Sequence, residues 1–252
     1  MRIAVAGGTG VVGRHVVRVA EERGHEPVVL ARSQGVDLTT GAGLAGRLDG
    51  VDAVVDVTSV RTQSKRKAMA FFGDITGNLL TGESAAGVGH HVALSIVGID
   101  EVPFGYYEGK LEQERIIAAG EVPWTILRAT QFHEFAHQVL FYAGFGKVAF
   151  VPQMLSQPIA AAEAGEALVD LVEAGPSGAV PDLAGPEKLQ MVDMARRLVK
   201  ARGLGRRIIP IRLPGATGKG LRSGALTPST DGPRGKITFD EWLGQGSGST
   251  TP

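Results

Sequence analysis

The sequence contains no cysteine among its 252 residues, which excludes disulfides, thiolate metal sites and cysteine nucleophiles. It also lacks an apolar run long enough to span a membrane. Lys and Arg total 26 and Asp and Glu total 26, so no net charge draws the whole chain to nucleic acid or to an anionic membrane surface. What remains is a chain long enough to bury a full hydrophobic core.

Two further features are missing from the sequence. The opening residues lack the basic-then-apolar layout of a secretory signal peptide, because glycines from Gly7 onward interrupt the first apolar run. We therefore expect a soluble, cytoplasmic protein. His90 and His91 have no carboxylate or thiol partners at ligand spacing, so we expect no metal site.

A glycine-rich loop follows the first apolar run. Residues 3–6 are apolar throughout, as in a strand buried on both faces of a parallel sheet, and from residue 11 onward apolar residues recur at helical spacing. A Gly-x-x-Gly-x-x-Gly spacing between strand and helix allows a tight turn, close approach of a phosphate and close helix packing. We interpret this loop as a dinucleotide site, whose predicted contacts are Gly7, Gly8, Thr9, Gly10, Val11, Val12 and Gly13.

The end of the second predicted strand, residues 27–31, carries Arg32 and Ser33 and no acidic residue. An acid at this position binds the ribose hydroxyls of NAD, whereas an arginine accommodates the phosphate of NADP. A guanidinium pairs with a phosphate in a bidentate manner, and a serine hydroxyl adds a donor. The sequence therefore favours NADP, with NADPH preferred over NADH.

Apolar strands and helical segments alternate along residues 1–128. Further strands are predicted at 51–57, 91–96 and 124–127, with a weak helix near 43–48 and a helix over 65–86 that Gly73, Gly77 and Gly82 interrupt. This order predicts a doubly wound, Rossmann-like parallel α/β sheet with right-handed crossovers.

Three polar residues near strand ends have two interpretations each. Asp37 either caps the following helix or meets the adenine edge of the cofactor. Thr58 and Ser59 follow the third strand, where open α/β sheets bind ligands, so they either reach the cofactor or cap the next helix.

The candidate catalytic residues lie beyond the fourth strand. Tyr106 and Lys110 are four residues apart, so both project from one face of a helix. A tyrosine hydroxyl has a pKa near ~10 and needs a neighbouring cation to transfer protons near neutrality, a charge that Lys110 supplies. Tyr107 lacks this spacing to the lysine. Ser95 ends the fourth strand as the third candidate. An exposed, functionless pair at this spacing is the alternative.

Several segments together resemble an atypical short-chain dehydrogenase/reductase of the NmrA-like type. They are the glycine loop, Arg32, residues 93–98 (Ala-Leu-Ser-Ile-Val-Gly), Tyr106 with Lys110, and residues 123–128 (Pro-Trp-Thr-Ile-Leu-Arg), within about residues 1–175. The resemblance implies that the tyrosine is the acid/base and that the lysine orients the nicotinamide ribose and lowers the tyrosine pKa. It also implies that Ser95 polarises a substrate carbonyl.

Two departures from the family pattern stand out. The family has Arg-Pro after the fifth strand, whereas this chain has Arg128-Ala129. Asn78 is the only asparagine and lies where a packing residue is expected, so the catalytic asparagine of typical members has no clear counterpart. NmrA-like proteins include reductases and also sensors that bind the cofactor without chemistry.

The substrate region is predicted after the fifth strand, at Gln131, Phe132, His133 and His137. Helical spacing would place the two histidines on one face, where they act as a proton relay, bind the substrate by hydrogen bonds, or form a satisfied packing pair. We expect a dinucleotide-binding core over 1–143, a smaller substrate-binding lobe over 144–244, partly interleaved with it, and a disordered tail over 245–252.

The sequence thus predicts an NADPH-dependent oxidoreductase that transfers hydride to a carbonyl or quinone-like small molecule. An aromatic secondary-metabolite intermediate is one candidate. The alternative is a non-catalytic NADP(H)-binding redox sensor. We expect a small-molecule substrate as the partner, no nucleic acid and no membrane, with a homodimer as an open alternative to a monomer.

Overall fold

The computed structural model describes residues 1–142 and 144–245, so the tail expected over 245–252 lies, except for Gln245, outside the described residues. Contacts divide the chain into two compact units. The first comprises residues 1–95, 104–128 and 162–181, and the second comprises 96–103, 129–161 and 182–252. The two units are described separately below.

A six-stranded parallel sheet forms the centre of the first unit. The residues of its four inner strands are mostly buried, because helices cover both faces. In spatial order they are β2 (Glu26–Leu30), β1 (Arg2–Ala6), β3 (Ala53–Asp56), β4 (His90–Ile96), β5 (Trp124–Ala129) and β9 (Gly178–Ala179). The predicted doubly wound α/β sheet is confirmed.

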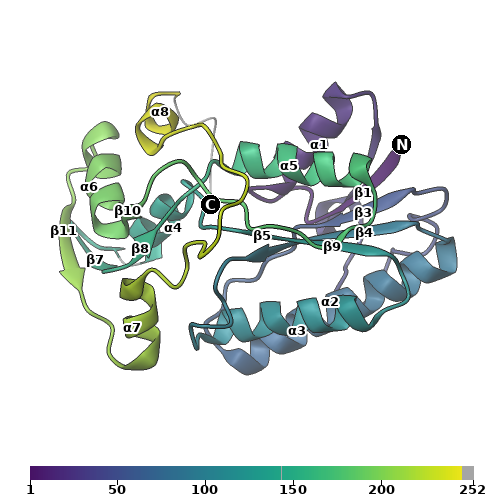
Figure 1. Ribbon diagram of the computed structural model, residues 1–252, viewed down its shortest axis with the longest axis horizontal. Coiled ribbons are helices and arrows are strands. Elements are labelled where there is room, and N and C mark those ends of the chain that lie inside the picture. The colour runs from purple at the N-terminus through teal and green to yellow at the C-terminus, as the bar shows by residue number, and fades with distance from the viewer. Residues whose placement is uncertain (143, 246–252) are drawn as a thin grey trace. The chain divides into compact units, whose positions relative to one another are not determined.

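Two pairs of helices cover the sheet (Figure 1). Helices α1 (Gly13–Glu22) and α5 (Ala161–Ala174) lie on one face, and α2 (Lys65–Ala86) and α3 (Gly105–Ala119) lie on the other. Glycines allow close helix packing on each side. A Cβ at Gly109 in α3 would lie 2.7 Å from the Cβ of Ala68 in α2, and one at Gly165 in α5 would lie 2.7 Å from the Cβ of His15 in α1.

Helix α2 runs for 22 residues without a break, so the predicted interruptions at its three internal glycines were wrong. A glycine costs a helix ~1 kcal/mol relative to alanine. Burial of Phe72, Ile75 and Leu79, each at most 3 % exposed, contributes ~1.5–3 kcal/mol per side chain. The tertiary packing therefore outweighs the local preference.

The weak helix expected near residues 43–48 does not form, and turns occupy this connection between β2 and β3. Four glycines along it, Gly41, Gly43, Gly46 and Gly50, have φ between +67° and +76°. A right-handed helix cannot continue through such residues. At Gly43 a Cβ would lie 2.1 Å from the carbonyl oxygen of Gly35, so this turn needs glycine for space as well.

The second unit has its own small sheet and helices. In spatial order its main sheet is β11 (Arg207–Ile211), β7 (Val148–Pro152) and β6 (Gly144–Phe145), and β8 (Leu155–Ser156) pairs with β10 (Leu189–Gln190). Its helices are α4 (Phe135–Tyr142), α6 (Met191–Ala201), α7 (Gly215–Ser223) and α8 (Phe239–Gly244).

Residues 96–103 belong to the second unit because glycine packing holds them there. A Cβ at Gly98 would lie 1.8 Å from the carbonyl oxygen of Ala225, and the Thr217 hydroxyl donates to the carbonyl of Pro103. The chain therefore leaves the first unit after β4 and returns to it with α3.

Candidate functional site

The sheet order of the first unit creates a switch point between β1 and β3. The chain leaves β1 toward β2 on one side and returns to β3 on the other, and ligands of open α/β sheets bind outside the carboxyl ends of the strands at such a point. The glycine loop follows β1 there, and Val57, Thr58 and Ser59 follow β3. Gly7 has φ +80°, and a Cβ on it would lie 3.0 Å from the carbonyl oxygen of Val57. The two segments are therefore in close contact.

The backbone geometry of the glycine loop is suited to binding a phosphate. A Cβ at Gly13 would lie 2.2 Å from the carbonyl oxygen of Gly7 and 2.7 Å from the Cα of Gly8, so any side chain there would push the loop away from α1. Gly10 is exposed, and no described side chain caps the N-terminus of α1 at Val12. The backbone N–H groups of Arg14 and His15 already donate to Gly10 and Val12, but the positive end of the α1 dipole favours an anion, and the loop is suited to a dinucleotide pyrophosphate.

Arg32 begins a 3-10 turn, η1 (Arg32–Gln34), directly after β2. Its side chain is 74 % exposed, and its Nε lies 3.9 Å from a carboxylate oxygen of Asp37. Asp37 accepts hydrogen bonds from the backbone N–H and the hydroxyl of Thr39, and these bonds, with a smaller effect of Arg32, lower the pKa of its carboxyl group. Ser33 is exposed beside Arg32. The guanidinium of Arg32 therefore lies in solvent near the end of β2.

The interpretation of Thr58 and Ser59 as caps of the next helix is wrong, because Ser64 occupies that position. Its hydroxyl accepts the backbone N–H of Lys67 at the start of α2. Thr58 is 8 % exposed, and its Oγ1 has no partner among the described residues. A buried hydroxyl without a partner is costly, which fits a position that a bound ligand would satisfy.

Tyr106 and Ser59 come together from α3 and from the end of β3. Their hydroxyl oxygens are 2.9 Å apart, and the tyrosine ring contacts Phe72 edge-on at 5.6 Å between ring centroids. Burial raises the pKa of Tyr106, the hydrogen bond with Ser59 opposes that rise, and the carboxylate of Asp56 adds to it. The phenol is therefore protonated near neutral pH, and its pKa shifts in the opposite direction to the lowering expected from Lys110.

Lys110 is buried, with 3 % of its surface exposed. Its Nζ donates to the carbonyl oxygen of Leu94 at 2.6 Å and to the side-chain carbonyl of Gln113. Gln113 in turn donates to Asp56 at 2.7 Å. Burial lowers the pKa of Lys110 to about 8, although Asp56 and then Glu114 act in the opposite direction. A chain of hydrogen bonds from Lys110 through Gln113 to Asp56 thus links the lysine ammonium to the end of β3.

The sequence interpretation missed Asp56 and Gln113. Asp56 is the one charged residue inside the buried run 53–56, and that was a readable signal because a lone carboxylate in a buried strand needs a partner. Gln113 lies three residues after Lys110 on the same helix, but only the fold shows that it faces the sheet.

Ser95 lies near the C-terminal end of β4 and is 3 % exposed, and its Oγ has no hydrogen-bond partner among the described residues. Parallel pairing aligns Asp56 with Ala93, so Ser95 lies two residues further toward the ligand-binding edge of the sheet. Like Thr58, it is a buried hydroxyl that a ligand would satisfy.

The expected substrate residues lie in the second unit. His133 precedes α4 and is fully buried; its Nε2 lies 3.0 Å from the carbonyl oxygen of Ile237, and its ring contacts Phe239 and Trp242. His137 contacts the same tryptophan, and burial, followed by the charge of Arg202, lowers its pKa. Both histidines therefore pack against α8.

The other two predicted substrate residues lie at the start of the same segment. The side-chain carbonyl of Gln131 accepts a hydrogen bond from the Ser156 hydroxyl at 3.1 Å, while its Nε2 is buried with no partner among the described residues. Phe132 forms a single parallel bridge with Ile159. Gln131 thus retains a donor for a ligand, whereas the histidine rings are engaged with aromatic neighbours.

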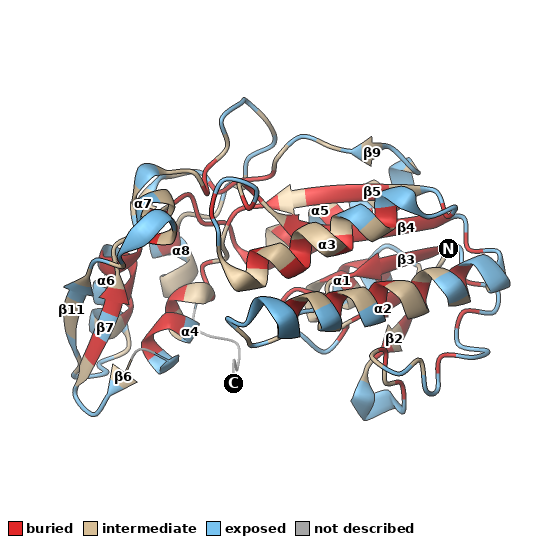
Figure 2. Ribbon diagram, turned by 90° about the horizontal axis from the view of Figure 1, so that it is seen from below, coloured by how far each residue is buried: buried red, intermediate tan, exposed pale blue. Residues whose placement is uncertain are grey.

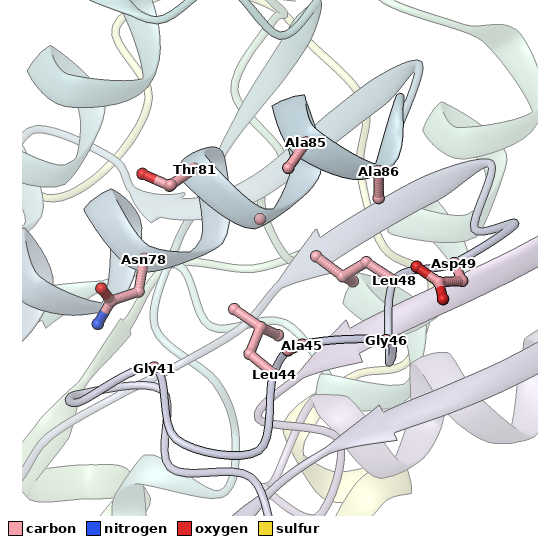
Figure 3. A pocket seen from close by; sticks show the side chains of 11 residues that line it. Gly41, Leu44, Ala45, Gly46, Leu48, Asp49, Asn78, Thr81, Ala85 and Ala86 are labelled. Carbon is pink, nitrogen blue, oxygen red and sulfur yellow. The ribbon is translucent and has the colours of Figure 1, made fainter.

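A cavity of about 420 Å³ lies between the turns of residues 41–49 and the second half of α2 (Figure 3). Small and aliphatic residues line it, with Asn78, Thr81 and Asp49 as its polar members. Asn78 donates to the carbonyl oxygen of Leu38, which is a structural contact. None of the predicted site residues lines this cavity.

No group of three or more His, Asp or Glu residues within the described part of the chain is arranged to hold a metal ion. No helix within it is long and apolar enough to cross a membrane.

Comparison with known proteins identifies a protein family that matches this chain. The model of the NAD(P)H-binding family matches residues 7–144. The photosystem II assembly factor Ycf39 of Synechocystis sp. is 29 % identical over 147 residues, covering 52 % of this chain and 45 % of that protein, so the match spans less than half of Ycf39.

Quinone oxidoreductase 2 of Escherichia coli K12 is 25 % identical over 227 residues, which cover 80 % of this chain and 74 % of that enzyme. The crystal structure of an NADPH-dependent quinone oxidoreductase, QOR2, from Escherichia coli complexed with NADPH superposes with a TM-score of 0.71 at 20 % identity. That superposition covers 96 % of this chain and 99 % of the other and shows a shared fold.

Proposed function

This chain belongs to the NAD(P)H-binding family of atypical short-chain dehydrogenases/reductases, and we propose that it is an NADPH-dependent oxidoreductase that reduces a carbonyl or quinone-like small molecule. The observation that carries the proposal is the Tyr106–Ser59 pair. A partly buried, protonated phenol on α3 pairs with Ser59 just beyond the end of β3, in the segment that contacts the glycine loop.

Each residue has a role in this proposal. NADPH, when bound, supplies the hydride. Tyr106 donates the proton to the developing oxyanion, and Ser59 holds the phenol in position by its 2.9 Å hydrogen bond. Ser95 donates its unpartnered hydroxyl to the substrate oxygen. Lys110 holds a positive charge on the same helix, one turn from Tyr106.

The test is the variant Tyr106→Phe with Tyr107→Phe as the matched control. General acid catalysis contributes ~10²–10⁴-fold to a rate, so Tyr106→Phe should lower kcat/KM by at least ~100-fold. NADPH affinity should change by less than about twofold, because the phenol makes no phosphate contact in this proposal. Tyr107→Phe should keep near-normal turnover.

The assay follows NADPH oxidation across a panel of quinones and carbonyl compounds. Undiminished turnover by Tyr106→Phe would show that Tyr106 is not the proton donor. Tight NADPH binding without oxidation by any panel member would instead favour the redox-sensor function, because the sensor needs only the cofactor site.

We also propose that Arg32 makes the chain prefer NADPH over NADH. The guanidinium lies at the end of β2 with its head in solvent, where it can pair with the phosphate of NADP. Charge-assisted hydrogen bonds contribute ~1.5–3 kcal/mol, so Arg32→Ala should weaken NADPH binding by ~10–100-fold and leave NADH binding unchanged. Arg18→Ala, which removes a surface arginine paired with Glu22, is the control. Equal losses for both cofactors would contradict the assignment.

A further inference from the structure

One face of the β11–β7–β6 sheet in the second unit is largely apolar and partly exposed. Val148, Phe150 and Pro152 on β7 alternate with Ala149 and Val151, which are fully buried on the side of α4 and α6. Strand neighbours share a face, and the register aligns Phe145 with Val148 and Ile209 with Phe150. The outer face, called the apolar face below, therefore consists of Phe145, Val148, Phe150, Pro152, Arg207, Ile209 and Ile211.

Exposed large apolar side chains gather on and beside this face. Phe145 is 85 % exposed and Phe150 is 46 % exposed. Phe141 and Tyr142, at the end of α4 just before β6, are also more than half exposed. Figure 2 shows the turn between β6 and β7 in pale blue, the colour of exposed residues. Single exposed apolar residues are ordinary, but a cluster of this kind marks an interaction surface.

Two sequence segments of the second unit are basic, although the whole chain is neutral. Residues 135–162 and 194–230 contain no Asp or Glu. Lys147 lies in the exposed β6–β7 turn, and Arg207 lies on the face itself. Helix α6 adds Arg196 and Arg197 on the covered side of the sheet, where they pair with Asp193 and Asp240. The cations at the apolar face are therefore Lys147 and Arg207.

We propose that the apolar face docks onto an anionic lipid bilayer. Aromatic side chains are suited to the boundary between hydrocarbon and headgroups, and flanking Lys and Arg side chains can extend to lipid phosphates. The contact is peripheral, since no described helix is long and apolar enough to cross a membrane. The overall neutrality that argued against a membrane surface conceals this local concentration of positive charge.

The composition of the face favours lipid over two other occupants. A second copy of the chain, placed face to face, would bring the cations Lys147 and Arg207 of each copy together. The bases of a single-stranded nucleic acid stack on planar rings such as those of Phe145 and Phe150, which leaves the aliphatic Val148, Ile209 and Ile211 unused. Hydrocarbon accepts both the aliphatic and the aromatic members.

The experiment uses the full chain and extruded vesicles of phosphatidylcholine, with and without phosphatidylserine, in a sedimentation assay. We expect binding to the vesicles that contain phosphatidylserine, and we expect high salt to weaken it because salt screens the charge attraction. The double variant Phe145→Ser with Phe150→Ser should bind at least ~10-fold more weakly, since it loses the apolar contribution.

Charge reversal tests the electrostatic part. Lys147→Glu with Arg207→Glu should abolish the preference for phosphatidylserine. Arg66→Glu with Lys67→Glu makes the same charge change on exposed residues of α2 in the first unit and should keep that preference. Far-ultraviolet circular dichroism and NADPH binding verify that each variant is folded.

Three results would overturn the proposal. The first is absence of binding to phosphatidylserine vesicles at low salt. The second is binding that the Phe145 and Phe150 substitutions leave unchanged. The third is a self-association or single-stranded DNA binding that these substitutions abolish while vesicle binding persists. None of these readouts depends on catalytic turnover, so they are independent of the proposed reaction.

Discussion

The buried ammonium of Lys110 makes the stability of this protein depend on pH in a defined direction. The side chain is 3 % exposed, and burial lowers its pKa from 10.5 to about 8. Between these two values the unfolded chain binds a proton that the folded chain has released. The free energy of unfolding therefore rises with pH across this window, because the folded state is relieved of a buried charge.

The size of this effect follows from the two pKa values. The difference between 10.5 and about 8 corresponds to ~3 kcal/mol in total. Roughly 1.5 kcal/mol of it falls between about pH 8 and pH 9.5, below the range in which exposed tyrosines ionise. The substitution Lys110→Met keeps the length of the side chain, removes the charge and should eliminate this gain.

The assay is urea unfolding of the wild type and of Lys110→Met at the two pH values. His91, whose pKa Glu83 raises against the effect of burial, contributes with the opposite sign, but it is present in both chains and largely cancels in the comparison. Lys67→Met, on the exposed face of α2, should keep the wild-type gain. An equal gain in the wild type and in Lys110→Met would refute the reasoning.

Two other predictions concern the first unit. Gly13→Ala should raise the Kd for NADPH at least ~10-fold and lower the free energy of unfolding by ~1–3 kcal/mol, because its Cβ would lie 2.2 Å from the carbonyl oxygen of Gly7. NADPH titration and urea unfolding measure the two effects. The control is Gly77→Ala, whose Cβ would have no neighbour within 4 Å and which should be neutral or stabilising in both assays. Asp56→Asn should lower the pKa of Lys110 below about 8, since the Asp56 carboxylate raises that pKa. The pH at which the free energy of unfolding begins to rise should then be lower than in the wild type. An unchanged pH dependence of stability would contradict this coupling.

The sheet and the glycine loop could be predicted from the sequence because they depend on local properties. Apolar runs such as residues 3–6 have few alternatives to a strand buried on both faces. Gly13 is needed because α1 contacts the loop just before it, within a stretch of seven residues. The helix expected near residues 43–48 failed because glycines with positive φ make turns there, and the fold, rather than the local pattern, decides where they do so.

The histidines show the opposite case. Spacing allowed His133 and His137 to share a helix face, but the structure places the first before α4 and packs both rings against Trp242, more than a hundred residues later in the chain. Only the return of the C-terminal helix α8 shows which neighbours these rings have.

Local sequence patterns were enough to predict the strands of the parallel sheet, the position of the glycine loop and the candidate residues Tyr106 and Lys110. The tertiary structure decided which groups meet. It joined Tyr106 to Ser59 and connected Lys110 through Gln113 to Asp56. The physical reason is that secondary-structure propensity and hydrophobic periodicity act over a few residues. Hydrogen bonds and burial, which shift a pKa, involve residues that are far apart in the sequence and that only the folded sheet brings together.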